Sequence, residues 1–237
     1  MTGALAIFVK TPGHSSVKSR LAAECGERYA TDWYRHASAA VASVARAAHA
    51  GYGVTAYWAV AEPDALVEWT DLPVIGQGEG SLGERMACVH SQLVARHGFG
   101  LLIGADAPQV TVELLGEAFT WLAATSPRLA LGPARDGGFW LFGGNVAPTS
   151  ANWLAVQYSA ANTARDLQHS MRGVGEWLTL KTLSDVDIVS DLDIVHRDLQ
   201  ALPTPTIEQC ALLHWMRKHD AALLPSPRSR GEGAEGG

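Results

Sequence analysis

Short apolar runs alternate with longer stretches of helical periodicity along most of the chain. The run from Ala4 to Val9 is uninterrupted and leads into Lys10, which is typical of a buried strand that runs into a loop. By the same criterion we expect strands over residues 4–9, 54–60, 74–75, 100–104, 129–132, 139–142 and 177–180. Apolar residues at helical spacing predict helices within 20–50, over 82–97, 111–124 and 162–171, and after residues 190 and 206.

Capping residues mark several of these boundaries. Gly51 is the expected stop of the first helical segment, and Thr111 is the expected N-cap of the helix over 111–124. Strands that alternate with helices imply right-handed crossovers and a mainly parallel sheet with helices on both faces. The sequence therefore predicts an α/β fold, built as a single three-layer αβα domain.

The end of the chain has a different composition from the rest. Residues 225–237 are rich in Pro, Ser, Gly and Arg and contain almost no apolar residue. Such a segment cannot bury enough apolar surface to fold. We expect a domain over residues 1–220 and a disordered tail over 221–237.

Composition and charge narrow the possible ligands and the compartment. A content of 47% hydrophobic and 18% charged residues is that of a globular protein. The formal net charge of −6 argues against a nucleic-acid partner, although a local basic pocket could still hold a small anion. The first residues contain no signal-peptide pattern, and no apolar run is long enough to span a membrane, so we expect a cytoplasmic protein. Oligomeric state stays open.

The first candidate for ligand chemistry is the basic segment, residues 10–21, which follows the first strand. It contains Lys10-Thr11-Pro12-Gly13 and, close to an expected helix start, Lys18 and Arg20. Two cations beside free backbone amides suit a polyphosphate, whereas a solvated pair of surface charges is the alternative. The segment lacks the GxxxxGK[ST] pattern of a Walker loop.

The second candidate is the glycine-rich segment, residues 76–86, which precedes a helix. Its glycines would let a ligand approach the backbone, and the helix that follows presents the positive end of its dipole. Gly78, Gly80 and Gly83 also satisfy GxGxxG, and Asp106 ends the next strand, so a Rossmann dehydrogenase that binds NAD stays an alternative. Against it, the strand before the glycines is very short.

Aspartates that follow strands supply the third candidate. Asp106, Asp136, Asp185 and Asp187 lie on loops beside expected strands. Magnesium commonly takes one or two protein carboxylates together with phosphate oxygens and water. From its loop position alone, an Asp such as Asp106 is more often a turn or cap residue than a metal ligand. Asp136, in Asp136-Gly137-Gly138, fits a hairpin turn and a general base equally.

Taken in order, these motifs resemble the bacterial family known as radical-SAM/selenodomain-associated, glycosyltransferase-like transferases. The resemblance runs from about Ala4 to about Leu199 and rests on five motifs: Lys10 to Gly13 with Val17 to Leu21; Gly76 to Gly78 with Leu82 to Met86; Gly104 to Pro108; Gly132 to Ala134 with Asp136 to Gly138; and Asp185 to Asp187. It implies the nucleotide-diphospho-sugar transferase (A-type glycosyltransferase) fold, which phospholactate and molybdenum-cofactor guanylyltransferases also have. Ser19 and Tyr158-Ser159 depart from the family pattern, which often has Thr at the first position and Trp-Ser at the second.

By this resemblance, the nucleotide-binding residues are Lys10, Thr11, Pro12, Gly13, Lys18, Arg20, Gln77, Gly78, Gly83 and Arg85. Asp106, Asp185 and Asp187 would hold Mg²⁺ or Mn²⁺, and Lys18, Arg20 and Asp136 would be catalytic. The resemblance implies transfer from a nucleotide-activated donor, most simply a glycosyl group from a nucleotide sugar, to an unknown acceptor. Nucleotidyl transfer with release of pyrophosphate is the alternative within the class. A non-catalytic nucleotide-binding module is an alternative from another class.

Overall fold

The protein, seen in a computed structural model, is described over residues 2–219. The predicted tail, 221–237, lies outside the described residues. The strands are β1 (Gly3–Val9), β2 (Thr55–Val60), β3 (Val74–Gly76), β4 (Phe99–Gly104), β5 (Arg128–Pro133), β6 (Phe139–Gly144) and β7 (Glu176–Thr179). The helices are α1 (Ser19–Cys25), α2 (Glu27–Tyr52), the 3-10 helix η1 (Pro63–Glu68), α3 (Leu82–His97), α4 (Val112–Leu122), α5 (Ser150–Leu154), α6 (Thr163–Ser170), α7 (Val189–Gln200) and α8 (Ile207–His219).

All seven strands form one sheet in the order β3-β2-β1-β4-β6-β5-β7. β6 is antiparallel to both of its neighbours, β4 and β5, while the other pairings are parallel. The carboxyl ends of β1, β4 and β5 therefore meet at one edge, and the turn from β5 into β6 lies at that same edge. This edge positions the site described below.

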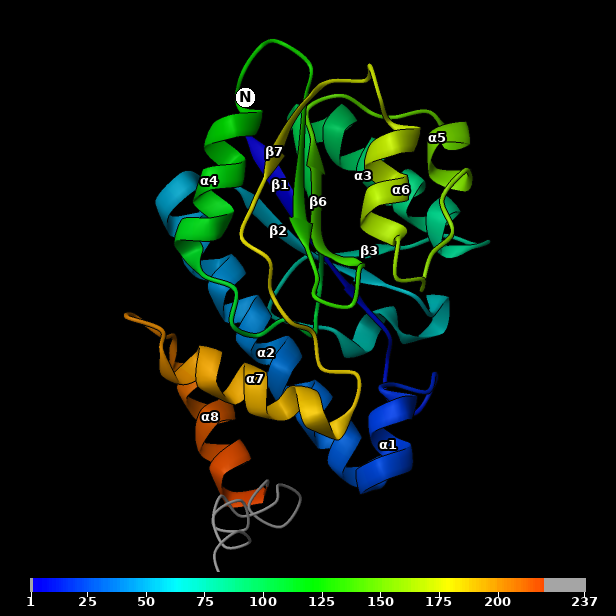
Figure 1. The fold of residues 1–237 in the computed structure, drawn as a ribbon. Helices are drawn as coiled ribbons and strands as arrows, with labels where there is room; N and C mark the ends of the chain where they lie inside the picture. The colour runs from blue at the N-terminus through cyan, green and yellow to red at the C-terminus, as the bar shows by residue number, and fades with distance from the viewer. Residues whose placement is uncertain (1, 220–237) are drawn as a thin grey trace, which may run out of the picture.

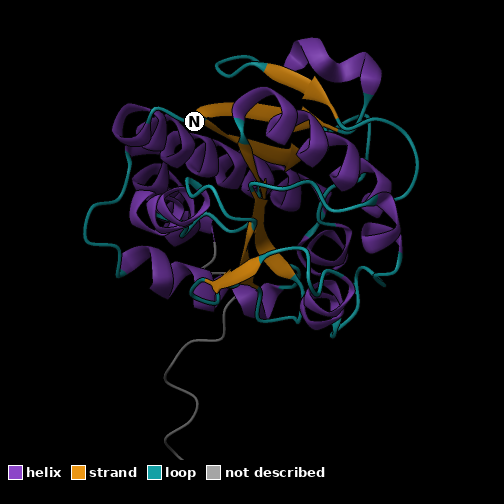
Figure 2. Ribbon diagram, turned by 90° about the horizontal axis from the view of Figure 1, so that it is seen from above, coloured by secondary structure: helices purple, strands orange, loops and turns teal. Residues whose placement is uncertain are grey.

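Helices cover both faces of the sheet (Figures 1 and 2). α2 and α4 lie on one face, with α7 and α8 beyond them, and α3, α5 and α6 lie on the other. Each face has its own apolar core, built by alternate residues of the central strands, such as Leu5 and Ile7 on the α2 face and Ala4 and Ala6 on the α3 face. The predicted three-layer α/β fold is confirmed. No helix within residues 2–219 is long and apolar enough to cross a membrane.

All seven expected strands are present, and Thr111 caps α4 by accepting a hydrogen bond from the backbone N–H of Leu114. The prediction for the first helical segment was wrong in two respects. Gly26, at φ 90°, divides it into α1 and α2, and α2 continues through Gly51 to end before Gly53, whose φ of 67° is left-handed. Gly53 ends the helix because it takes that conformation without a Cβ clash. The short elements η1 and α5 were not predicted.

Candidate functional site

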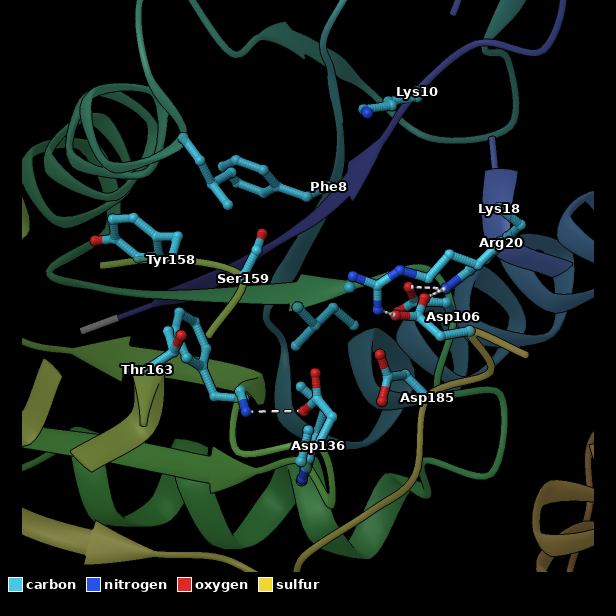
Figure 3. Close-up of a pocket in the computed structure, with 18 of the residues that line it drawn as sticks. Phe8, Lys10, Lys18, Arg20, Asp106, Asp136, Tyr158, Ser159, Thr163 and Asp185 are labelled. Atoms are coloured by element: carbon cyan, nitrogen blue, oxygen red, sulfur yellow. Dashed lines mark hydrogen bonds and ion pairs between the residues drawn. The ribbon is translucent and has the colours of Figure 1, made fainter. Parts of the chain in front are cut away.

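A cavity of about 700 Å³ opens at the carboxyl edge of the sheet, where the ends of β1 and β4 meet the β5–β6 turn. Seven of the predicted site residues line it: Lys10, Lys18, Arg20, Asp106, Asp136, Asp185 and Asp187. Figure 3 shows Lys18, Arg20 and Asp106 grouped together on one side, with Asp185 and Asp136 next to them. Lys10 and Asp187, which are 177 positions apart in the sequence, are thus collected at one edge of the sheet.

Lys18 is the cation that lies deepest in this cluster. Its Nζ lies 2.7 Å from Asp106 Oδ2 and 3.3 Å from Asp187 Oδ1, and only 7% of its side chain is exposed. Burial lowers the pKa of Lys18, but the charges of Asp106 and Asp187 and the hydrogen bond to Asp106 raise it by more, so the net shift is upward. The ammonium group therefore stays charged. Lys18 is also the residue before α1, where its φ of 47° is left-handed, an uncommon conformation for a residue with a side chain.

Arg20 extends the positive charge toward solvent. Its Nη1 lies 3.3 Å from Asp187 Oδ2, and 71% of its side chain is exposed. Asp187 therefore lies between two cations, of which one is buried and one is free to move. A guanidinium group so placed can change partners when an anion enters the cavity, because an exposed ion pair is weak.

Within residues 2–219, neither Asp185 nor Asp136 forms an ion pair with a lysine or arginine. Burial, followed by the charges of Asp106 and Asp136, raises the pKa of Asp185 to about 6, although Lys18 lowers it. Asp136 is exposed in the β5–β6 turn, where its Oδ1 accepts a 2.8 Å hydrogen bond from the backbone N–H of Gly138. Asp136 therefore belongs to the hairpin turn and also lines the cavity.

Whether these carboxylates fit a divalent metal depends on how many can reach one ion. Within residues 2–219, no three His, Cys, Asp or Glu side chains are close enough together to hold a metal. The structure thus does not bring Asp106, Asp185 and Asp187 together as a three-carboxylate site, because the Lys18 ammonium pairs with two of them. Asp106 and Asp187 nevertheless share that one partner, and two hard carboxylates completed by phosphate oxygens are a usual magnesium set. The residues therefore fit a metal that arrives with a phosphate ligand.

Part of the basic segment lies outside the cavity. Thr11 and Pro12 border a separate shallow depression of about 300 Å³, and Gly13 lines neither of the two. The Thr11 backbone N–H donates to Glu62 Oε2 at 2.9 Å, and its Oγ1 accepts from the Trp69 indole at the same distance. Thr11 therefore anchors the segment to its neighbours, and the cavity receives only Lys10 and residues 16–20.

None of the four predicted residues of the glycine-rich segment lines the cavity. Gln77 is buried, and its Nε2 donates to the carbonyls of Val9 and Ala59 at 3.1 and 2.9 Å. Arg85 Nε donates to the Gly80 carbonyl at 3.0 Å. A Cβ on Gly83 would lie 2.9 Å from the Tyr158 ring, so this glycine permits close packing of α3. Gly78 does not line the cavity either, and its φ of 82° requires a glycine for the turn.

The sheet differs from that of the Rossmann alternative. Its order of 3-2-1-4-6-5-7, with β6 antiparallel, contrasts with the 3-2-1-4-5-6 order of dinucleotide-binding sheets. The GxGxxG match falls on Gly78, Gly80 and Gly83, none of which lines the cavity. The geometry therefore gives no support to a dehydrogenase.

Sequence reasoning missed several residues that line the cavity. Tyr34 is buried on α2, and its hydroxyl accepts a 3.0 Å hydrogen bond from the Lys10 backbone N–H. Burial raises the pKa of Tyr34, so its own proton stays available for a ligand. It is 14 positions beyond Arg20 in an Ala-rich helix, and no local pattern distinguishes it. The other missed lining residues include Phe8, Leu82, Met86, Phe139, Tyr158 and Ser159.

Comparison with known proteins bears on both the family and the fold. The model of a family described as "uncharacterized protein conserved in bacteria (DUF2064)" matches residues 39–160. A crystal structure from Desulfovibrio desulfuricans G20, provisionally described as a nucleotide-diphospho-sugar transferase, is 25% identical, with 92% of this chain and 96% of that chain covered and a TM-score of 0.78. This similarity confirms the predicted fold. No curated protein matches the sequence.

Two more distant structures have TM-scores below the level at which likeness informs function. One is CMP:2-keto-3-deoxy-manno-octonic acid synthetase complexed with CTP, 13% identical over 85% of this chain and 100% of that chain, with a TM-score of 0.48. The other is 4-diphosphocytidyl-2C-methyl-D-erythritol synthase from Anaerococcus prevotii DSM 20548. It is 10% identical over 84% of this chain and 96% of that chain, with a TM-score of 0.49.

Proposed function

The chain belongs to the DUF2064 family, and from this membership and the geometry of the cavity we propose that it is a transferase that uses a nucleotide-activated donor. The observation that carries the proposal is the cluster of Lys18 and Arg20 against Asp106 and Asp187, at the sheet edge where α/β folds bind ligands. The similar structure described provisionally as a nucleotide-diphospho-sugar transferase supports the same class of donor.

The reaction that we propose is glycosyl transfer from a nucleotide sugar to an acceptor. Lys18 and Arg20 would bind the diphosphate and stabilise the negative charge that develops on the leaving nucleoside diphosphate. Asp106 and Asp187 would hold Mg²⁺ or Mn²⁺, which neutralises phosphate charge when it is bound. Lys10 also lines the cavity, and the Tyr34 hydroxyl is a neutral hydrogen-bond donor there, so both would contact the donor.

Asp136 is the proposed general base. It lines the cavity from the β5–β6 turn and accepts a hydrogen bond from the Gly138 N–H, and in the described part of the chain it forms no ion pair. A carboxylate held in this way can accept the proton of an acceptor hydroxyl as the new bond forms. The tight turn fixes its position from the backbone, as general-base catalysis requires.

Nucleotidyl transfer is the second candidate, because the same cation and carboxylate cluster would also stabilise a pyrophosphate leaving group. The products separate the two: release of nucleoside diphosphate would exclude nucleotidyl transfer, and release of pyrophosphate would exclude glycosyl transfer. A non-catalytic module would bind donors without turnover. Cytoplasmic location and association with radical-SAM or selenodomain proteins stay predictions.

The experiment that tests the proposal is a thermal-shift screen of nucleoside triphosphates, UDP- and GDP-sugars and NAD, each with and without Mg²⁺. A ligand at a hundred times its Kd adds about 2.7 kcal/mol, which raises the Tm of a chain of this length by roughly 5 to 10 °C. Arg20→Ala should lose that shift, whereas Arg85→Ala, also once predicted to bind nucleotide but outside the cavity, should keep it. A shift with NAD alone would contradict the proposal.

A further inference from the structure

The cavity has two chemically different halves. Every cation that lines it comes from residues 10–20, and Lys18 and Arg20, which lie together in Figure 3, define the cationic half. The apolar half is lined by Phe8, Leu82, Met86, Phe139 and Tyr158. Phe8 and Tyr158, with Ser159 and Thr163, lie away from Lys18 and Arg20 in Figure 3. Four of these five apolar residues pack into the core of the α3 face, so the sheet itself supports this wall.

Few polar groups of the apolar half are free to bind a ligand. The Tyr158 hydroxyl donates to the Trp153 carbonyl at 2.9 Å. Thr163 Oγ1 is engaged with backbone groups of residues 157 and 160 at 2.8 to 3.1 Å. Within residues 2–219 the exposed hydroxyl of Ser159 makes no hydrogen bond, so it can contact a ligand. A ligand with many hydroxyl groups would leave most of them unpaired here, and each unpaired buried polar group costs binding energy.

The charges beside the apolar half are negative. Asp136 and Asp185 line the cavity between the two halves, and their charges influence each other. An anionic group in the apolar half would meet these carboxylates and find no lysine or arginine among the residues that line that half. Leu82 meanwhile keeps 46% of its surface exposed at the cavity rim, an unusual position for a leucine, and it extends the apolar wall toward solvent.

We propose that the apolar half binds the acceptor, and that the acceptor is an uncharged alcohol with an aromatic or alkyl body. This proposal rests on the proposed glycosyl transfer. The acceptor oxygen forms a bond to the anomeric carbon of the donor sugar, while the bond from that carbon to the diphosphate breaks. The nucleoside diphosphate leaves with the electron pair, and the hydroxyl proton passes to the Asp136 carboxylate. The proposal predicts that the carboxylates of Asp136 and Asp185 disfavour phosphorylated acceptors.

Benzyl alcohol and benzyl phosphate form a matched pair of probes, because they share one body and differ in charge. Their Kd values are measured by ligand-observed saturation-transfer NMR on the full chain. The cationic half is first saturated with Mg²⁺ and the nucleoside diphosphate of the donor found in the thermal-shift screen. We expect benzyl alcohol to bind about tenfold more tightly than benzyl phosphate, since a phosphate in the apolar half lies beside the Asp136 and Asp185 carboxylates.

Leu82→Lys places a cation at the rim of the apolar half and should abolish or reverse that preference. Leu154→Lys is the matched control, because Leu154 is also an exposed helical leucine, at 55%, but does not line the cavity. It should leave the preference unchanged. Tighter binding of benzyl phosphate to the wild-type chain would overturn the proposal.

The outcomes also separate this proposal from the one on which it rests. If the nucleoside diphosphate binds but displaces benzyl alcohol, the apolar half holds the nucleobase, so the acceptor proposal is wrong while the donor assignment stands. If no nucleoside diphosphate stabilises the chain, the proposed function itself is wrong. Simultaneous binding of both ligands supports the two proposals together.

Discussion

The basic segment and the glycine-rich segment look alike in sequence but differ in where the fold places them. Each follows a parallel strand, and each leads into a helix, β1 into α1 and β3 into α3. β1 lies in the interior of the sheet beside β4, whereas β3 is an edge strand. From β1 the chain crosses to β2 on the α2 face, and from β3 it returns to β4 on the α3 face, so the order of strands reverses between β1 and β4. Ligands of α/β sheets bind at that point of reversal.

The comparison teaches that position relative to this reversal, and not glycine content, decides which loop brings charged residues to the cavity. The glycine-rich segment contributes only Leu82 and Met86 to the lining. Lys18 follows β1 and Asp106 follows β4, so the two strands that flank the reversal supply the closest ion pair of the site. The glycine-rich segment is used locally instead. Ser81 and Glu84 form a reciprocal capping box at the start of α3. These two side chains are therefore already hydrogen-bonded within the segment, without a ligand.

The largest effect should come from Lys18→Ala. We expect kcat/KM for the donor to fall on the order of a hundred- to a thousand-fold, because one preorganised charge-stabilising group contributes about 3 to 4 kcal/mol to transition-state binding. Steady-state kinetics with the donor found in the screen would measure it. Lys181→Ala, at an exposed lysine outside the cavity, is the control. Near-wild-type turnover of Lys18→Ala would remove the basic segment from the mechanism.

Gln77→Leu should affect folding instead of catalysis. The substitution removes two hydrogen bonds from a buried amide, which should lower the free energy of unfolding by about 1 to 3 kcal/mol. Donor Kd should stay unchanged, because Gln77 does not line the cavity. Urea denaturation and a donor titration would measure the two quantities, with Gln92→Leu on the exposed face of α3 as control. A weakened donor Kd at normal stability would restore Gln77 as a ligand-binding residue.

The two segments also show what sequence could and could not predict. The strands were predictable because buried parallel strands are continuous apolar runs, as in residues 4–9. Seven of the predicted residues line the cavity because the loops that follow such runs begin at the carboxyl edge of the sheet. Strand order could not be read locally, and it is strand order that separates Lys18 from Arg85. Tyr34 and Tyr158 were missed for the same reason, since they reach the cavity only through the packing of helices and loops against the sheet.

A smaller predicted effect is that the two segments lose local structure in opposite directions of pH. His14 Nε2 lies 2.6 Å from Glu68 Oε1, and this hydrogen bond raises the pKa of His14 above its ordinary 6.5. This tether of the basic segment is complete below pH 6.5 and is lost as pH rises through the folded-state pKa. Hydrogen bonds from the Ser81 backbone and side chain lower the pKa of Glu84 below 4.5, so that tether is complete above pH 4.5 and is lost as pH falls through the folded-state pKa.

Amide hydrogen exchange, corrected for intrinsic rates, would test this opposition. Protection of His14 and Ser15 N–H groups, which bond the Thr11 carbonyl, should decrease toward alkaline pH, and protection of Ser81 and Arg85 should decrease toward acidic pH. His14→Gln should remove the first trend and leave the second. Identical trends in both segments would show that the titration is global.

The smallest expected effect is that of Arg85→Ala, and it tests the comparison most directly. The one side-chain hydrogen bond of Arg85 within residues 2–219 goes to the Gly80 carbonyl of the same segment. We therefore expect the free energy of unfolding to change by no more than about 0.5 kcal/mol and the donor Kd to stay unchanged. Arg20→Ala, measured in parallel by calorimetric titration, should weaken donor binding about tenfold, because it removes a charged phosphate contact. Equal losses in the two variants would mean that the glycine-rich segment moves over the cavity when donor binds. The difference between the segments would then not persist in the donor complex, and the reversal between β1 and β4 would locate only part of the site.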